Sequence, residues 1–241
     1  MLIYGKNAVI EAIKSGKTIN KIYFQKGSNE VFEIVKDAMN KNVVCISADK
    51  IKLDKMITEE NEKLKNSQGI VANITDYNYF EIEDILKYAE SLNEKPKIVI
   101  LDKIEDPHNL GAIIRSINCL GFHGCIIQKR NACQVTDTVE KVAAGALSYV
   151  RVARVTNITE TIKKLKEEGL WIYGLDMDGK NTLKDENING AIALVIGNEG
   201  NGITRLVKEN CDVLVKIPMS GDISSLNASV SAAIAMYEVI R

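Results

Sequence analysis

The stretch KIVILDKIEDPHNLGAIIRSINCLGFHGCIIQ, residues 97–128, decides the fold. Its two ends, 97–102 and 124–128, are short apolar runs of strand length. Between them, apolar side chains recur at the i, i+3, i+4, i+7 spacing of a helix face: Leu110, Ile113, Ile114 and Ile117. The stretch therefore predicts a strand, a helix and a second strand, which is the repeating unit of a parallel sheet.

The same alternation continues toward the end of the chain. Further apolar runs occupy 170–176, 191–197 and 213–218, with helical segments between them. Runs that are apolar throughout predict strands buried on both faces, so we expect an α/β domain over 95–241 with helices on both sides of a parallel sheet. The last segment is rich in Ala and Ser and predicts a helix that Ser225 or Asn227 caps.

The N-terminal third predicts a second, smaller α/β domain over 1–75. Its expected strands are 20–25, 43–46 and 69–74, and its expected helices are 49–57 and one whose apolar face is Val31, Ile34, Val35 and Ala38. The acidic segment 76–94 contains a helical stretch and is followed by Pro96, and we interpret it as a linker between the two domains.

Composition limits the classes of function. The chain has 241 residues, 46% of them hydrophobic and 26% charged, and a net charge of -1, so it lacks the strong positive charge typical of many nucleic-acid binders. Residues 1–75 carry twelve lysines against nine acids, which suits weak phosphate contacts. The five cysteines show no C-x-x-C spacing and no long apolar run is present. We expect a cytoplasmic protein with reduced thiols, no metal site and no membrane partner.

Three junctions between a strand and a helix carry polar or glycine-rich sequence, at 106–115, 197–202 and 220–229. Ligands of open α/β sheets bind beyond the carboxyl ends of the strands, so the three junctions could line one site. The alternative is three turns with no further role. The third junction offers Ser224, Ser225 and Asn227, which could equally be helix caps.

The second junction, GNEGNG, has the pattern G-x-x-G-x-G and not the G-x-G-x-x-G of dinucleotide folds. Glu199 would oppose a bound phosphate, so a neutral or cationic ligand fits better. Gly197, Gly200 and Gly202 could also be turn glycines with positive φ.

In the first junction Asn109 can cap a helix, and Arg115 falls off the apolar stripe of that helix. The chain has 25 lysines and only six arginines. An arginine in so lysine-rich a chain suggests a need for planar contact through several donors, although a solvated surface arginine is an equal alternative.

Three motifs together resemble the SpoU (TrmH-like) family of RNA ribose 2′-O-methyltransferases: DPHNLGAIIRS at 106–116, LVIGNEGNGI at 194–203 and IPMSGDISSLNASVSAAIA at 217–235. The stretches IYGKNAVIEAI and SQGIVA, at 3–13 and 67–72, are similar to the L30e-like substrate-binding domain of the large-subunit rRNA guanosine methylases in this family. The resemblance covers nearly the whole chain.

The resemblance implies a SPOUT methyltransferase domain with a deep trefoil knot, S-adenosylmethionine as cofactor, and a homodimer with the active site near the interface. The residues that it implies for the cofactor are Gly197, Ile217, Ser225, Leu226 and Asn227. The residues that it implies for catalysis are Asn109, Arg115, Glu199, Ser225 and Asn227.

The expected reaction is methylation of the ribose 2′-hydroxyl of a guanosine in 23S rRNA. Arg115 would hold the phosphate of the acceptor nucleotide and stabilise negative charge on the attacking oxygen, because guanidinium is a poor base at neutral pH. The alternatives are a SpoU methylase acting on tRNA or on an rRNA adenosine, and a non-catalytic RNA-binding or ribosome assembly factor. A nicotinamide-dependent oxidoreductase is disfavoured by the glycine pattern.

Overall fold

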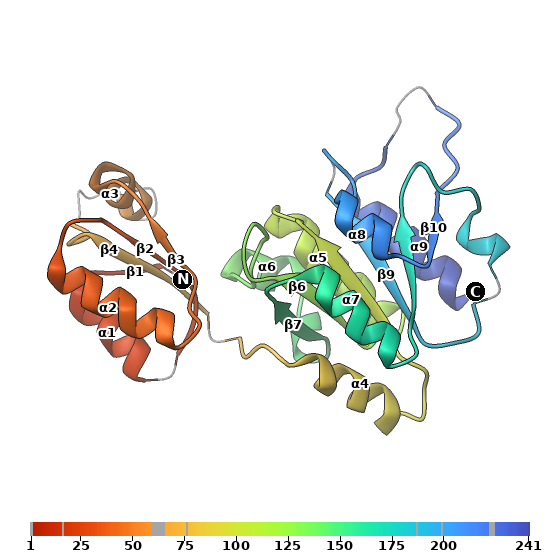
Figure 1. Cartoon of the computed structure of the whole chain (residues 1–241), viewed down its shortest axis with the longest axis horizontal. Helices are drawn as coiled ribbons and strands as arrows, with labels where there is room; N and C mark the ends of the chain where they lie inside the picture. Colours follow the sequence, from red (N-terminus) through yellow and green to blue (C-terminus); the bar gives the residue numbers. More distant parts are fainter. Residues whose placement is uncertain are drawn as a thin grey trace. The chain divides into compact units, whose positions relative to one another are not determined.

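The structure is a computed structural model that describes residues 2–15, 17–58, 66–75, 77–186, 188–198, 200–221 and 225–241. The chain divides into two compact units (Figure 1). The first comprises residues 1–78 with the short segment 135–137, and the second comprises 79–134 and 138–241. Among the described residues, no helix is both long and apolar enough to cross a membrane.

The first unit contains a four-stranded sheet in the order β1-β4-β2-β3. Strand β4 is antiparallel to both β1 and β2, and β3 is parallel to β2. Its elements are β1 (Leu2–Tyr4), α1 (Lys6–Lys14), β2 (Thr18–Phe24), α2 (Asn29–Asn40), β3 (Cys45–Ser47), α3 (Lys50–Thr58) and β4 (Ile70–Thr75).

Helices cover both faces of this sheet. The buried side chains of α2 are Val31, Ile34, Val35 and Ala38, as the sequence predicts, and they share a core with α1, Ile70, Ala72 and Ile74. Leu53 and Ile57 of α3 contact Val71, whose side chain points to the opposite face because side chains alternate along a strand. The sequence predicts neither β1 nor α1, whereas β2, β3, β4 and α3 lie within two residues of their expected bounds.

The second unit contains a six-stranded sheet in the order β10-β8-β9-β5-β6-β7. Every neighbouring pair of strands in it is parallel, which confirms the predicted α/β fold with a parallel sheet. The strands are β5 (Lys97–Asp102), β6 (Gly124–Gln128), β7 (Arg151–Val155), β8 (Trp171–Leu175), β9 (Ile192–Gly197) and β10 (Val213–Val215).

The helices of this unit lie on both faces of the sheet. They are α4 (Ile82–Ser91), α5 (Pro107–Cys119), α6 (Asp137–Ala143), α7 (Ile158–Glu167), α8 (Arg205–Asn210) and α9 (Ala228–Ile240), with short 3₁₀ turns η1 (Ala146–Ser148) and η2 (Leu183–Asp185). One core joins α4, α7 and α8 to the sheet. Helices α5 and α9 pack against each other and against β6 and β9 (Figure 1).

The strand order determines which loops meet. The chain runs outward from β5 through β6 to β7, crosses to β8, and then places β9 between β5 and β8 before β10 returns beyond β8. The carboxyl ends of β5, β8, β9 and β10 therefore meet at one edge of the sheet, where ligands of α/β folds bind. The trefoil knot that the resemblance implies stays a prediction.

Two features of this unit differ from expectation. The segment 76–94, predicted as a linker with a helical stretch, does contain a helix, α4, but its residues from 79 on belong to the second unit. Ile85 and Ala89 of α4 are fully buried, and Ile85 packs into the core beneath the sheet. Strand β7 was also not expected, since arginines interrupt its apolar pattern; Arg151 stacks on Tyr88 with its guanidinium carbon 3.4 Å from the ring centre.

Candidate active site

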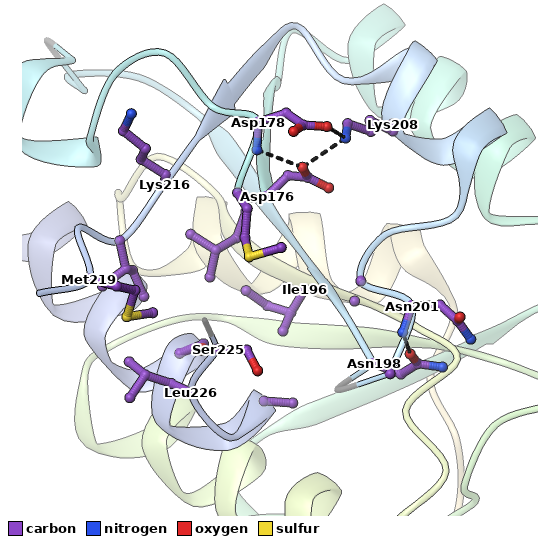
Figure 2. Close-up of a pocket in the computed structure, with 18 residues that line it drawn as sticks. Asp176, Asp178, Ile196, Asn198, Asn201, Lys208, Lys216, Met219, Ser225 and Leu226 are labelled. Carbon is purple, nitrogen blue, oxygen red and sulfur yellow. Dashed lines mark hydrogen bonds and ion pairs between the residues drawn. The ribbon is translucent and has the colours of Figure 1, made fainter. Parts of the chain in front are cut away.

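A cavity of about 400 Å³ lies at the carboxyl edge of the six-stranded sheet (Figure 2). Its walls come from the loops that follow β8, β9 and β10, from α8 and from the beginning of α9. This volume is in the range of small-molecule sites. Segments more than fifty residues apart in the sequence therefore enclose one cavity. The second and third junctions are among them, as expected if the junctions line one site.

The lining of the cavity is mixed. Leu175, Ile196, Ile217 and Leu226 supply apolar surface, and Asp176, Asp178 and Lys208 supply charge. Apolar surface suits an adenine ring, and carboxylates suit the positive charges of a sulfonium and an α-ammonium group. The residues present therefore fit S-adenosylmethionine, the cofactor that the sequence resemblance implies.

In the turn after β9, one of the three glycines of GNEGNG has a role other than the positive φ that the sequence suggests. Gly197 does not have positive φ; instead, a Cβ atom there would lie 2.0 Å from the carbonyl carbon of Gly202. The turn is closed by the Gly202 N–H, which donates to the Asn198 carbonyl over 2.9 Å. Gly202 has φ of +63°, as a turn glycine would, whereas a Cβ at Gly200 meets only Asn198 Oδ1 at 3.8 Å.

The third junction contacts the first through two amide side chains. Asn227 is the N-cap of α9, since its Oδ1 accepts from the Ser229 N–H over 2.9 Å. Its Nδ2 donates to Oδ1 of Asn109 over 2.9 Å. Asn109 is buried and does not cap α5, because Asp106 holds that place and accepts from the His108 N–H. One predicted cap is therefore confirmed and the other is wrong, but both residues lie at the site.

A buried carboxylate links β5 to the residues that directly follow the second junction. Asp102, at the end of β5, is fully buried, and its Oδ2 accepts from the Thr204 N–H over 2.7 Å. Asp102 belongs to none of the three sequence motifs. An aspartate that ends an otherwise apolar central strand was the available signal, because a carboxylate there needs a partner.

The predicted residues do not all meet in one chain. Gly197, Ile217, Ser225 and Leu226 line the cavity, and Asn109 and Asn227 are joined beside it. Arg115 is exposed, does not line the cavity, and has no hydrogen-bond or ion-pair partner among the described residues. It lies six residues after Asn109, roughly 9 Å further along the helix axis. Glu199 lies outside the described residues.

The charges in the cavity are organised around one lysine that sequence analysis did not consider. The ammonium of Lys208 contacts Oδ1 of Asp176 at 2.7 Å and Oδ2 of Asp178 at 2.6 Å (Figure 2). Hydrogen bonds to both carboxylates raise the pKa of Lys208, and the hydrogen bond from Lys208 lowers the pKa of Asp178. Lys208 and Asp178 are therefore both charged at neutral pH.

We expect Gly197→Ala to destabilise the protein by at least about 2 kcal/mol, because the methyl group overlaps the backbone of Gly202. Gly200→Ala is the matched control in the same turn and should change stability by less than about 0.5 kcal/mol. Chemical denaturation of the two variants checks this. Equal stability of both would contradict the backbone contact.

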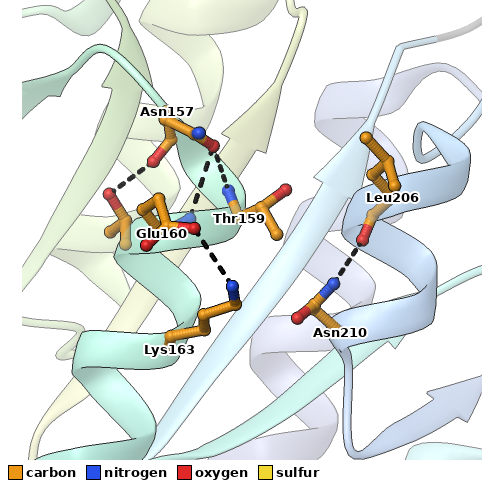
Figure 3. Close-up of polar contacts among 7 residues, drawn as sticks. Asn157, Thr159, Glu160, Lys163, Leu206 and Asn210 are labelled. Atoms are coloured by element: carbon orange, nitrogen blue, oxygen red, sulfur yellow. Dashed lines mark hydrogen bonds and ion pairs between the residues drawn. The ribbon is translucent and has the colours of Figure 1, made fainter.

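We expect Asn227→Ala to cost about 1 kcal/mol through loss of the helix cap. Asn157→Ala is the control, since Asn157 caps α7 in the same way, accepting from the Thr159 and Glu160 N–H groups (Figure 3). Both variants should unfold more easily, but only Asn227→Ala also removes the contact with Asn109. A fall in Asn109 side-chain order in Asn227→Ala alone, measured by NMR, would support that distinction, and equal order in both variants would refute it.

Comparison with known proteins supports these observations. The model of the SpoU rRNA Methylase family matches residues 96–237, and the model described as RNA 2′-O ribose methyltransferase substrate binding matches residues 2–80. YacO of Bacillus subtilis (strain 168), whose name places it in the TrmH family of tRNA/rRNA methyltransferases, is 42% identical over 241 residues, 99% of this chain and 94% of YacO.

Two solved structures are similar in fold. The SpoU methyltransferase AviRb from Streptomyces viridochromogenes, in complex with the cofactor AdoMet, is 23% identical with a TM-score of 0.62, covering 100% of this chain and 89% of that chain. The TrmH/SpoU tRNA modifying enzyme of A. aeolicus is 26% identical with a TM-score of 0.55, covering 65% of this chain and 81% of that chain. One family model spans more than half of this chain, and one relative matches it almost from end to end. The chain therefore belongs to the SpoU rRNA methylase family.

Proposed function

We propose that this protein transfers the methyl group of S-adenosylmethionine to the ribose 2′-hydroxyl of a guanosine in 23S rRNA, in the cytoplasm. The observation that carries the proposal is the hydrogen bond between Asn227 and Asn109. It joins the first and third motifs beside a cavity that the second and third motifs enclose. Membership in the SpoU rRNA methylase family supports RNA as the substrate.

The cavity would hold the cofactor. Backbone groups near Gly197 and the apolar side chains of Ile217 and Leu226 would contact it, with Ser225 and Asn227 at its polar side. When bound, S-adenosylmethionine supplies an electrophilic methyl group on a sulfonium. The protein's own contribution is to hold the acceptor oxygen in line with that methyl group and to exclude water. The AdoMet complex of AviRb supports this choice of cofactor.

Arg115 would act on the RNA and not on the cofactor. Its guanidinium is exposed and unpaired among the described residues, so it is available to grip a phosphate with two parallel hydrogen bonds. It would also stabilise negative charge that grows on the attacking oxygen. Asn109 would help to position the acceptor, and Glu199, by charge, would orient Arg115.

A homodimer would allow Arg115 to reach a cavity that it does not line in one chain. Helix α9 exposes an apolar stripe on one face: Val230, Ile234 and Tyr237. Such a stripe on a helix favours burial against another helix. Because α5 packs against α9, an interface on this face would lie close to the helix that carries Arg115.

The first unit would choose the RNA. It contains no arginine, so its contacts to RNA would use lysine charges and the shape of the RNA. The match of residues 2–80 to a substrate-binding model supports this role. Its similarity to the L30e-like domain of rRNA guanosine methylases favours 23S rRNA over tRNA, the substrate class named for the A. aeolicus enzyme.

The test is to map ribose 2′-O-methyl marks on 23S rRNA and tRNA from cells with and without the gene, and to repeat the reaction with purified protein and labelled S-adenosylmethionine. Loss of one guanosine mark in 23S rRNA, restored by the purified protein, is the expected result. A lost mark in tRNA or on an rRNA adenosine would change the substrate but keep the reaction. No lost mark and no transferred label would leave a non-catalytic RNA-binding or assembly role.

We expect Arg115→Lys to lower the single-turnover rate by about 100-fold or more, because lysine cannot reproduce the bidentate contact. Affinity for S-adenosylmethionine should stay unchanged. Arg205→Lys is the control, since Arg205 is exposed and, within the described part of the chain, its ion-pair partner is Glu209 of its own helix. A near wild-type rate in Arg115→Lys would refute the role of the guanidinium.

We expect removal of residues 1–75 to abolish methylation of 23S rRNA while leaving the dissociation constant for S-adenosylmethionine unchanged. The reason is that all the described residues that line the cavity lie in the second unit. Titration of the shortened protein with cofactor, beside a methylation assay, separates the two effects. An unchanged methylation rate would show that the first unit does not select the RNA.

A further inference from the structure

One feature of the cavity is not explained by the motifs. Lys208 comes from α8, which follows the glycine-rich turn, whereas Asp176 and Asp178 follow β8. Its ammonium contacts both carboxylates, at 2.7 Å and 2.6 Å, and all three residues line the cavity. The lysine therefore joins two walls that the backbone does not connect directly (Figure 2).

The turn that Lys208 contacts begins with a backbone hydrogen bond to β10, from the Asp176 N–H to the Val215 carbonyl over 2.9 Å. Oδ1 of Asp176 also accepts from the Asp178 N–H over 3.0 Å, and the carbonyl of Asp176 accepts from the Gly179 N–H over 3.1 Å. Gly179 lies directly against the end of β10, since a Cβ there would be 2.5 Å from the carbonyl carbon of Val215. The turn 176–179 is thus held by β10 on one side and by Lys208 on the other.

The two carboxylates differ in exposure. The side chain of Asp176 is 13% exposed and that of Lys208 is 26% exposed, so this pair is largely shielded from solvent. The side chain of Asp178 is 79% exposed, and its share of the interaction is screened by water and salt. Removal of Lys208 would leave the shielded carboxylate of Asp176 without its charged partner, and the turn would move to hydrate it.

We propose that Lys208 is a positioning residue for the methyl donor: by bridging Asp176 and Asp178 it fixes the 176–179 wall of the cavity before the donor binds. The proposal rests on the proposed function, in which this cavity takes S-adenosylmethionine. If the wall is already fixed, no conformational entropy is lost in ordering it when the ligand binds. A mobile wall must become ordered on binding, and that entropy loss lowers the affinity.

A simple charge effect predicts the opposite result, which makes the proposal testable. The bridge carries two negative charges and one positive charge, and removing the lysine makes the cavity more negative. Charge alone would then strengthen binding of S-adenosylmethionine, which has a net positive charge, relative to its product S-adenosylhomocysteine, a zwitterion that lacks the sulfonium charge. Loss of positioning would instead weaken binding of both ligands to a similar extent.

The experiment measures dissociation constants of the full-length protein for both ligands by calorimetric titration. We expect Lys208→Met to weaken binding of both by about tenfold, and Lys208→Arg, which can bridge both carboxylates, to restore most of the loss. Lys166→Met is the matched control, because Lys166 pairs with Asp212 at the same 2.7 Å distance but does not line the cavity. It should leave both dissociation constants unchanged.

The outcomes separate the two hypotheses. If the wild type binds S-adenosylmethionine and Lys208→Met binds it equally well or more tightly, the positioning role is wrong and the proposed function stands. If the wild type binds neither ligand, the proposed function fails and the positioning role fails with it. Thermal unfolding without ligand shows whether Lys208→Met is folded; if it is not, Lys208→Gln, which keeps a hydrogen-bond donor, takes its place under the same criteria.

Discussion

The site depends on one hydrogen bond between two amide side chains, from Asn227 to Asn109. Asn109 stands in the first turn of the helix after the central strand, and Asn227 opens the last helix of the chain. The bond spans 118 residues of sequence. Because Asn227 also caps its own helix, the same side chain sets where α9 begins and what that beginning faces. The cavity keeps its shape only while this end of α9 stays in place.

Strand order provides the frame for that contact. With β9 between β5 and β8, the glycine-rich turn emerges beside the carboxyl end of the central strand, and Asp102 fixes it there through the Thr204 N–H. The contact of Gly197 with the backbone of Gly202 then leaves no room for a side chain at the end of β9. The loops that form the site in this protein are thus positioned by close backbone contacts as much as by polar side chains.

Local pattern was sufficient for much of the fold. Strands 97–102 and 124–128 have their predicted bounds because unbroken apolar runs mark strands buried on both faces. The helix predicted within 76–94 is confirmed as α4, but its place in the second unit was not predicted, because the acidic composition outweighed Ile85 and Ala89, two fully buried apolar residues one helical turn apart. Strand β7 was not predicted because it contains arginines, which give its sequence the pattern of a solvent-exposed segment. In the structure these arginines stack on aromatic rings. Two polar contacts of the site, Asp102 with Thr204 and Lys208 with Asp176, produce no periodic pattern in the sequence, because each joins distant segments.

The position of α9 has a consequence for protein synthesis. Ribosomes make chains from the N-terminus, and the residues that complete the cavity, 225–231, follow all the strands of the six-stranded sheet in the sequence. A nascent chain in which all six of these strands are already made still lacks the wall that Ser225 and Leu226 provide. The cavity can therefore bind a ligand only after residues 225–231 have been made, so the methyl donor cannot act as a scaffold while the strands of the sheet are being synthesised.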